Sequence, residues 1–161
     1  NFKLDLSQFF SFLDKKKYDF KIIGGYYPSN FEIDDLEILH FFKKRKFIVT
    51  LPIIRKNNQM DFFNWSTDEP LKINKYGIPE PISSKMLYPD VLLVPLVAYD
   101  NNLNRLGYGG GFYDRYIAKI EQSKKIIKIG LAFSHQELSR VPTNSHDKKL
   151  DFIMTEKGIL Q

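Results

Sequence analysis

The chain has 161 residues, no cysteine and a formal net charge of +5, and 43% of its residues are hydrophobic. This composition fits one folded domain and excludes a disordered chain, a disulfide scaffold and a thiolate metal site. No apolar run reaches the roughly 20 residues of a membrane span and no signal peptide opens the chain, so we expect a cytoplasmic protein without a membrane partner.

In the first half of the chain, hydrophobic spacing predicts alternating helices and strands. The expected elements are a helix within residues 4–13, a strand over 20–27, a helix over 30–45 and strands over 47–51 and 60–65. Ser29 followed by Glu32 fits a capping box that starts the second helix. Pro28 and Pro52 are expected to end the strands that precede them, because proline donates no hydrogen bond to a sheet.

The second half of the chain opens with a proline-containing connection and continues as alternating strands and helix. The expected elements are this ordered connection over residues 66–90, strands over 91–94, 126–133 and 152–154, and a helix over 112–121. The run Val91-Leu92-Leu93-Val94 lacks polar alternation, which is typical of a parallel strand buried on both faces. Strands that alternate with helices predict an α/β fold with a mainly parallel sheet and helices on both of its faces.

A glycine-rich loop directly precedes the predicted helix 112–121, and four of the nine glycines lie between Gly107 and Gly111. One glycine is enough for a tight turn, whereas several let the backbone approach a bulky ligand and direct consecutive N–H groups at an oxyanion. The positive end of the helix dipole adds to this field. Arg105 can offer a charged fork to phosphate, and Asp114 can hold Mg²⁺. The loop therefore predicts binding of a nucleoside triphosphate.

The same loop has structural interpretations that need no ligand. It can be a glycine-rich connection between a strand and a helix, Asp114 can complement the helix dipole alone, and Arg105 can be a solvated surface residue. The segment is not a Walker loop, because no Gly-Lys-Ser/Thr ends it. It is not a Rossmann fingerprint either, because Phe112 stands where that pattern has its last glycine.

Three neighbouring segments carry a specific pattern: residues 89–95 (PDVLLVP), 98–100 (AYD) and 104–115 (NRLGYGGGFYDR). Together they resemble the signature of the 5-formyltetrahydrofolate cyclo-ligase family, whose members are also called 5,10-methenyltetrahydrofolate synthetases. Weaker blocks agree in order along nearly the whole chain: Tyr26-Tyr27-Pro28 with Glu32-Ile33, Leu51-Pro52, Met60-Asp61-Phe62, Gly77-Ile78-Pro79-Glu80-Pro81, Leu131-Ala132-Phe133, Val141-Pro142 and Asp147-Lys148-Lys149-Leu150-Asp151.

The resemblance implies a single three-layer α/β/α, Rossmann-like domain over residues 1–161 that acts as a monomer. It also implies an ATP- and Mg²⁺-dependent enzyme that converts 5-formyltetrahydrofolate to 5,10-methenyltetrahydrofolate and releases ADP and phosphate. Phosphorylation of the formyl oxygen makes an activated imidate, which the folate N10 attacks. This chemistry needs positioning and charge neutralisation rather than a nucleophilic side chain.

The resemblance further implies roles for individual residues. The positions that match the ATP-phosphate loop are Arg105, Leu106, Gly107, Tyr108, Gly109, Gly110, Gly111, Phe112 and Tyr113, with Arg105 and Tyr113 in catalytic roles. The positions that match folate contacts are Tyr27, Glu32, Tyr76, Tyr108, Gly109, Gly110, Gly111 and Phe112. Asp114 and Asp147 match the Mg²⁺ carboxylates. Simpler alternatives exist for three of these residues: the capping box for Glu32, a turn for Asp147 and the core for Tyr76.

The chain departs from the family pattern at its start. Family members usually begin with a lysine- and arginine-rich helix whose side chains contact ATP, and Lys3 is not a convincing substitute for them. We expect this chain to begin after that helix. If the helix is absent, the expectation is weak ATP binding.

Two other function classes fit part of the sequence. The net charge and the aromatic residues beside Arg105 fit a nucleic-acid-binding module whose rings stack on bases, whereas lysines scattered along the chain fit an ordinary solvated surface. A noncatalytic relative that binds nucleotide or folate would keep the fold without turnover. The ligase interpretation is favoured, with a small-molecule substrate and no nucleic-acid partner.

Overall fold

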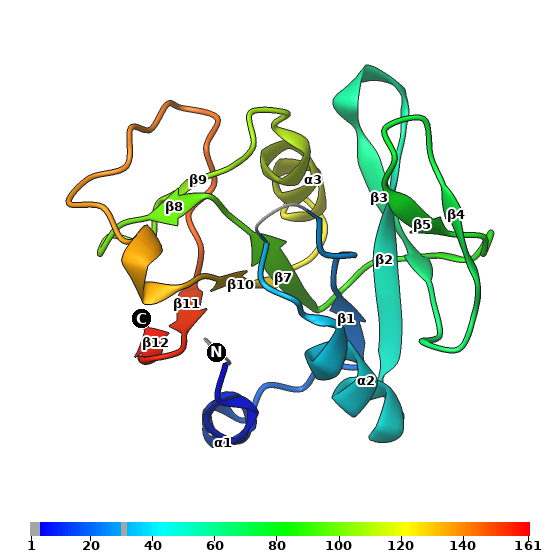
Figure 1. Ribbon diagram of the computed structural model, residues 1–161, viewed down its shortest axis with the longest axis horizontal. Helices are drawn as coiled ribbons and strands as arrows, with labels where there is room; N and C mark the ends of the chain where they lie inside the picture. The colour runs from blue at the N-terminus through cyan, green and yellow to red at the C-terminus, as the bar shows by residue number, and fades with distance from the viewer. Residues whose placement is uncertain (1–3, 30–31) are drawn as a thin grey trace.

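The centre of the molecule is an eight-stranded mixed sheet in the order β12-β11-β10-β7-β1-β2-β3-β6 (Figure 1). The computed structural model describes residues 4–29 and 32–161, so Lys3 lies outside the described residues. The strands of this sheet are β1 (Ile22–Gly24), β2 (Ile48–Ile54), β3 (Met60–Asn64), β6 (Met86–Leu87), β7 (Val91–Pro95), β10 (Ile127–Leu131), β11 (Phe152–Thr155) and β12 (Gly158–Leu160). Neighbouring strands from β11 to β2 run parallel, whereas the pairs β12–β11, β2–β3 and β3–β6 are antiparallel. The mainly parallel α/β fold is confirmed.

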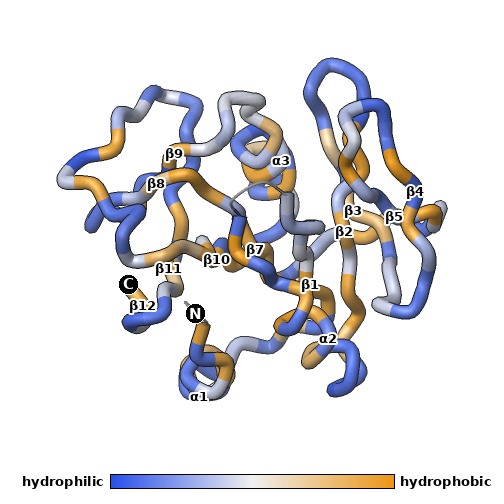
Figure 2. Tube along the Cα trace, in the orientation of Figure 1, coloured by the Kyte–Doolittle hydropathy of each residue, from blue (hydrophilic) through white to orange (hydrophobic). Residues whose placement is uncertain are grey.

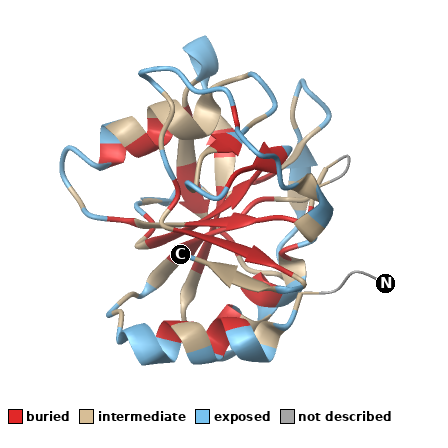
Figure 3. Cartoon of the chain, turned by 90° about the vertical axis from the view of Figure 1, so that its left-hand side faces the viewer, coloured by how far each residue is buried: buried red, intermediate tan, exposed pale blue. Residues whose placement is uncertain are grey.

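Helices cover both faces of this sheet, which gives three layers (Figure 3). The helices α1 (Leu6–Lys16) and α2 (Leu36–Lys44) pack on one face, and α3 (Phe112–Ile120) packs on the other. Strand β7 is buried along its whole length and divides the two cores, because successive side chains point to opposite faces. Val91 and Leu93 belong to the core beneath α1 and α2, whereas Leu92 and Val94 belong to the core beneath α3.

The polarity of the chain follows these layers. Hydrophobic residues gather along the central strands and the inward faces of the helices, and hydrophilic residues dominate the connecting loops (Figure 2). None of the helices in the described part of the chain is long and apolar enough to cross a membrane.

The second helix begins later than the capping box predicted. The Ser29 N–H does donate to Glu32 Oε2 at 2.7 Å, but α2 starts only at Leu36, whose N–H donates to Asp34 Oδ1 at 2.9 Å. Residues 30 and 31 of the predicted helix lie outside the described residues. Tertiary hydrogen bonds explain the delay, because the Tyr26 hydroxyl donates to the carbonyl oxygen that precedes Asp34 and holds that backbone out of a helix.

Strand β2 runs through Pro52 instead of ending there, so that prediction was wrong. The carbonyl of Thr50 accepts from the Gly25 N–H on the side of β1. Backbone groups two residues apart in a strand point to the same side, so the nitrogen of Pro52 also faces that side. Strand β1 has ended at Gly24, so the missing N–H of Pro52 breaks no hydrogen bond of the ladder.

Several short strands were not predicted. The connection 66–90 contains β4 (Leu71–Ile73), β5 (Pro79–Pro81) and β6, and the glycine loop is preceded by β8 (Ala98–Tyr99) and β9 (Arg105–Leu106). Strands β4 and β5 pair with each other, as do β8 and β9. The remaining predicted elements occur with shifted ends, and the glycine loop leads directly into α3.

The buried carboxylate of Asp100 fixes the turn between β8 and β9. Its Oδ1 accepts the Asn102 and Asn104 N–H groups at 2.9 and 3.1 Å, and its Oδ2 accepts the Asn104 Nδ2 and the Val141 N–H, both at 3.0 Å. Burial alone raises the pKa of Asp100, but the hydrogen bonds from Asn104, Val141 and Asn102 outweigh it and hold this pKa below its ordinary value. Asp100 thereby ties the segment around Val141 to the turn before the glycine loop.

We expect Asp100→Ala to lower the free energy of unfolding at neutral pH by about 3 kcal/mol, because several buried N–H groups lose a charged acceptor. Since the pKa is lowered on folding, the stabilisation is present above the unfolded value of 3.8 and is lost as pH falls through the folded value. Urea unfolding at neutral pH measures the loss of stability. The same experiment at acid pH, where Asp100 becomes protonated in the folded wild type, measures how much of that loss disappears. Asn101→Ala in the same turn is the control, and equal midpoints for the two variants would refute the role of Asp100.

Candidate active site

A cavity of about 1080 Å³ opens where the parallel strands β1, β2 and β7 end. Tyr26 follows β1, Ile54 ends β2 and Pro95 ends β7, and all three line the cavity. In open α/β sheets, ligands bind at the carboxyl ends of the strands where the connections diverge to opposite faces. Strand β1 is such a point here, because the chain leaves it toward α2 on one face while α3 follows β7 on the other.

The glycine loop forms one wall of this cavity and needs glycine for its backbone shape. Gly109 and Gly111 have φ angles of +89° and +62°, in the region that favours glycine. Gly111 is the N-cap of α3, so the free N–H groups of the first helical turn lie next to the cavity. Arg115 holds the loop from outside the turn, since its Nη2 donates to the Gly110 carbonyl and its Nε donates to the Asn58 carbonyl at 3.0 Å.

Replacing Gly111 with Ala tests the expectation from the sequence that this loop binds ATP, and it should weaken both folding and that binding. The left-handed backbone costs about 1 kcal/mol with a β-carbon, and that carbon would lie 2.9 Å from Arg115 Nη1. Displacement of Arg115 shifts the loop, so we expect the KM for ATP to rise about tenfold. Gly77→Ala is the matched control, because Gly77 also has positive φ but lies outside the cavity with open space around it. Similar KM values for ATP in both variants would contradict this expectation.

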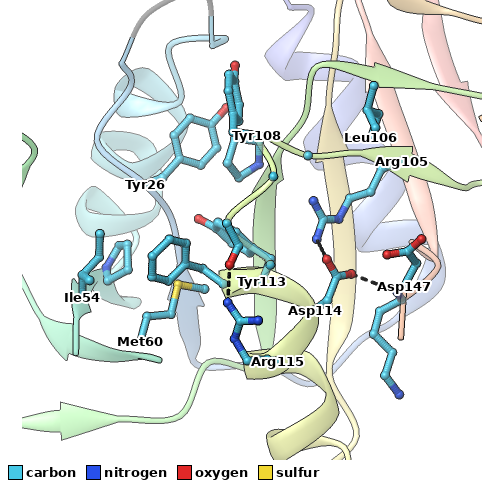
Figure 4. A pocket seen from close by; sticks show the side chains of 18 of the residues that line it. Tyr26, Ile54, Met60, Arg105, Leu106, Tyr108, Tyr113, Asp114, Arg115 and Asp147 are labelled. Atoms are coloured by element: carbon cyan, nitrogen blue, oxygen red, sulfur yellow. Dashed lines mark hydrogen bonds and ion pairs between the residues drawn. The ribbon is translucent and has the colours of Figure 1, made fainter. Parts of the chain in front are cut away.

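A buried ion pair stands beside the glycine loop (Figure 4). Arg105 Nη2 donates to Asp114 Oδ2 at 2.9 Å, and the two side chains are only 5% and 19% exposed. The Arg105 guanidinium carbon also lies 5.7 Å from the ring centre of Tyr113. Arg105 Nε has no hydrogen-bond partner among the residues that the structure describes. Arg105 lines the cavity, and a largely desolvated guanidinium at a cavity wall is suited to bind an anion.

Asp147 lies on the same side of the cavity as Asp114, on the segment that precedes β11 (Figure 4). Its Oδ2 accepts the Asn144 N–H at 2.7 Å, and the following Lys148 N–H donates to Asp114 Oδ1 at 2.9 Å. Two carboxylates, water and phosphate oxygens form a donor set that Mg²⁺ uses. The residues therefore fit a magnesium ion bound together with phosphate, although no group of three or more His, Asp or Glu ligands exists within the described ranges.

Aromatic side chains and one acid form the opposite side of the cavity, where Figure 4 places Tyr26 and Tyr108. Tyr27 and Glu32 line the cavity from the same segment as Tyr26. Burial raises the pKa of Glu32, and the hydrogen bonds from Ser29 only partly oppose this shift. Glu32 thus makes the local contact with Ser29 that the sequence indicated and also faces the cavity.

The cavity collects nearly all of the predicted site residues. Arg105 to Asp114, Asp147, Tyr27 and Glu32 line it, whereas Tyr76 is 54% exposed and lies outside its lining. Asn74, Ile78 and Pro79 line the cavity near Tyr76 in the sequence. Sequence reasoning missed the apolar lining residues Ile54 and Met60 and the cations Arg115 and Lys148. Arg115, Lys148 and Met60 stand in segments that carry the family resemblance, whereas Ile54 had no such signal.

The cavity lies at the strand ends of a three-layer α/β fold, and its wall combines a glycine loop at a helix N-terminus with the Arg105–Asp114 pair. Together these features define an α/β enzyme with a site for an anionic ligand. The chain belongs to the 5-formyltetrahydrofolate cyclo-ligase family, whose model matches residues 15–156. The chain is therefore a ligase of one-carbon metabolism. The activity of the family is ATP-dependent 5-formyltetrahydrofolate cyclo-ligation.

Individual relatives agree with this assignment. The 5-formyltetrahydrofolate cyclo-ligase of Haemophilus influenzae is 34% identical over 137 residues, which cover 81% of this chain and 73% of the relative. The Escherichia coli enzyme of the same name is 33% identical over 121 residues, which cover 72% of this chain and 65% of the relative. The solution structure of Aquifex aeolicus 5,10-methenyltetrahydrofolate synthetase superposes with a TM-score of 0.72 at 27% identity, covering 96% of this chain and 79% of that one.

Proposed function

We propose that this chain catalyses the ATP- and Mg²⁺-dependent cyclisation of 5-formyltetrahydrofolate to 5,10-methenyltetrahydrofolate, with release of ADP and phosphate. One observation carries the proposal: a single cavity is lined by the glycine loop, the Arg105–Asp114 pair and the aromatic wall. Two substrates that must react with each other need such a shared cavity.

The reaction balances without a covalent bond to the protein. The formyl oxygen on N5 attacks the γ-phosphorus of ATP, and ADP leaves with the electron pair of the broken P–O bond. The phosphorylated formyl carbon is then attacked by N10, which closes the five-membered ring. Phosphate departs with the former formyl oxygen, and N10 gives up its proton to a base or to water. Each step requires alignment and neutralised negative charge more than a strong nucleophile.

The phosphate side of the site consists of the glycine loop, the α3 N-terminus and Arg105. The N–H groups of residues 105–113 cradle the phosphates, and the positive end of α3 favours their charge. Arg105 contacts the transferring phosphoryl group with the part of its fork that Asp114 does not use. The Tyr113 ring beneath this guanidinium restrains its position, so both residues take part in catalysis.

Asp114 and Asp147 hold Mg²⁺ in this proposal. The ion, when bound, neutralises phosphate oxygens and so lowers the barrier to phosphoryl transfer. Because Asp114 also pairs with Arg105, the same carboxylate orients the Arg105 guanidinium and helps to hold the metal ion.

The folate side consists of Tyr27, Glu32 and the stretch from Tyr108 to Phe112. Flat aromatic side chains suit a flat pterin ring, and a carboxyl group suits its N–H donors. Tyr76 is also assigned to the folate side, since it lies in the β4–β5 turn whose neighbouring residues line the cavity. The enzyme is proposed to work as a monomer on small molecules, without a nucleic-acid partner.

A direct assay tests the proposal. The purified chain is mixed with 5-formyltetrahydrofolate, ATP and Mg²⁺, and the absorbance of the methenyl product is followed together with ADP. We expect equal amounts of methenyl product and ADP, and no product when ATP or Mg²⁺ is omitted. ADP formation without methenyl product, or no turnover under all conditions, would overturn the proposal.

A further inference from the structure

Asp35 is a fully buried acid at the start of α2 that the proposed reaction does not use. Its position is the N-cap of the helix, yet its side chain makes no capping hydrogen bond. The exposed neighbour Asp34 accepts the Leu36 N–H at 2.9 Å instead. The carboxyl group of Asp35 therefore does not cap the helix, although an acid at this position usually does.

Asp35 contacts the segment that carries Tyr27 and Glu32, the part of the proposed folate side called the folate-side wall here, which lies outside the glycine loop. Its Oδ2 accepts the Tyr26 N–H at 3.0 Å, and the Tyr26 hydroxyl donates to the Ile33 carbonyl at 2.8 Å. These two bonds hold Tyr26 against Ile33 and Asp35, and so connect residues 26–29 to residues 32–35. The segment carries four residues that line the cavity: Tyr26, Tyr27, Ser29 and Glu32.

The fit around this carboxyl group is close. A β-carbon on Gly25 would lie 2.7 Å from Asp35 Oδ2 and 2.5 Å from Leu39 Cδ1, so the backbone directly after β1 packs against the start of α2. Asp35 Oδ1 has no hydrogen-bond partner among the described residues. The hydrogen bond from the Tyr26 N–H to Oδ2 is therefore the contact that ties this carboxyl group to the neighbouring segment.

The surroundings of Asp35 favour its neutral form. Burial raises the pKa of Asp35 well above its ordinary value, and the acids Asp34 and Glu32 add to this rise. The buried hydroxyls of Tyr26 and Tyr113 also interact electrostatically with the carboxyl group. The Tyr26 N–H opposes the rise, but no cation contributes to it among the groups that shift this pKa. A neutral acid still accepts one N–H hydrogen bond, as an amide oxygen does.

We propose that Asp35 is a positioning residue that, through the Tyr26 backbone, holds the folate-side wall of the cavity in its binding geometry. This inference rests on the proposed function only for the identity of the ligand at that wall. Loss of the Asp35 acceptor leaves the Tyr26 N–H buried and unpaired, so the segment must move to find another partner. The phosphate side stays in place, because the glycine loop is held by Arg115 and α3 on the other face of the sheet.

Three variants test the proposal in steady-state assays. We expect Asp35→Ala to raise the KM for 5-formyltetrahydrofolate at least about tenfold while the KM for ATP changes by less than about twofold. Asp35→Asn keeps the shape and the acceptor of the neutral acid and should stay within about twofold of the wild type for both substrates. Asp34→Ala removes the neighbouring carboxylate that caps α2 and serves as the control for general fraying, with both KM values unchanged.

Several outcomes overturn the proposal. An unchanged folate KM in Asp35→Ala, an equal rise of both KM values, or a rise of the folate KM in Asp34→Ala would each do so. If Asp35→Ala does not fold, Asp35→Asn decides, because a large rise of its folate KM means that the carboxylate charge matters rather than the acceptor.

Amide hydrogen exchange separates this inference from the proposed function, because it needs no turnover. In Asp35→Ala, exchange of the amides of Tyr26, Tyr27 and Ser29 should accelerate at least about tenfold, while residues 107–111 keep their wild-type rates. Failure of the wild type to form methenyl product would refute the proposed function alone. Unchanged exchange at Tyr26, Tyr27 and Ser29 would refute the positioning role alone.

Discussion

Asp114→Asn should lower kcat/KM by at least about 100-fold while leaving the protein folded. The carboxylate has two tasks in the proposed site, since it pairs with the buried Arg105 and binds the metal that accompanies the phosphates. Asn keeps the size of Asp and an acceptor for the Lys148 N–H, which Asp114 Oδ1 now accepts at 2.9 Å. Because Asn carries no charge, it holds the Arg105 guanidinium less firmly and binds Mg²⁺ less tightly.

Asn is a sharper choice than Ala at this position. Removing the whole carboxylate leaves the guanidinium of Arg105 buried without its partner, which costs about 3–5 kcal/mol of folding free energy. A loss of activity in Asp114→Ala therefore mixes unfolding with lost catalysis. Asp114→Asn separates the two effects when thermal unfolding is recorded beside the activity.

The decisive measurement is turnover of Asp114→Asn over a titration of Mg²⁺. We expect a higher Mg²⁺ requirement and a residual rate that saturating Mg²⁺ does not restore. Asp61→Asn is the control. Asp61 lies on β3 and pairs at 2.9 Å with Lys119 of α3, the helix that also carries Asp114, but Asp61 does not line the cavity. Activity of Asp114→Asn within about tenfold of the control would show that the carboxylate is not part of the reaction machinery.

Arg105→Lys should lower kcat by about 100-fold although the charge is kept. The planar fork of Arg105 contacts Asp114 with one nitrogen and lies near the Tyr113 ring, so other donors stay available to a phosphoryl group. An ammonium group is a compact charge that cannot bind a carboxylate and a phosphate in the same plane. The variant should therefore bind ATP and transfer its phosphoryl group slowly.

Steady-state kinetics and ATP binding measured side by side distinguish these two steps for Arg105→Lys. We expect a small change in the dissociation constant of ATP and the main loss in kcat. Arg55→Lys is the control, since the Arg55 side chain is 48% exposed, pairs with Asp61 at 3.7 Å and does not line the cavity. If Arg105→Lys and Arg55→Lys retain the same kcat, the fork of Arg105 has no catalytic role.

Local sequence patterns predicted the elements that local physics determines. The unbroken apolar run of β7 and the helical spacing of α3 both appear in the structure, because burial on both faces and an amphipathic face leave direct traces in the sequence. The late start of α2 had no such trace. It depends on the hydrogen bonds of Tyr26 with Ile33 and Asp35, which only the folded chain brings together.

The same division holds for the candidate site. The glycine loop was evident because glycines with positive φ cluster next to a helix. Ile54 lines the cavity from the end of a strand, and nothing in its local sequence distinguishes it from a core residue. Motifs borrowed from the family supplied Asp147 and Tyr27, which lie far from the loop in sequence yet line the same cavity. The role proposed for Asp35 could be inferred only from the structure, because two adjacent acids, Asp34 and Asp35, form no recognisable sequence pattern.

The division of the core by β7 has a consequence for how this enzyme can change over generations. The segment that carries Tyr27 and Glu32 is connected to the layer of α1 and α2, whereas the glycine loop leads into α3 in the other layer. Effects of substitutions in separate clusters that share no partner tend to add independently. In the proposed site, substitutions in the α1 and α2 layer would therefore act mainly on the side of Tyr27 and Glu32, and substitutions in the α3 layer mainly on the glycine loop, so that evolution could change one side with little effect on the other.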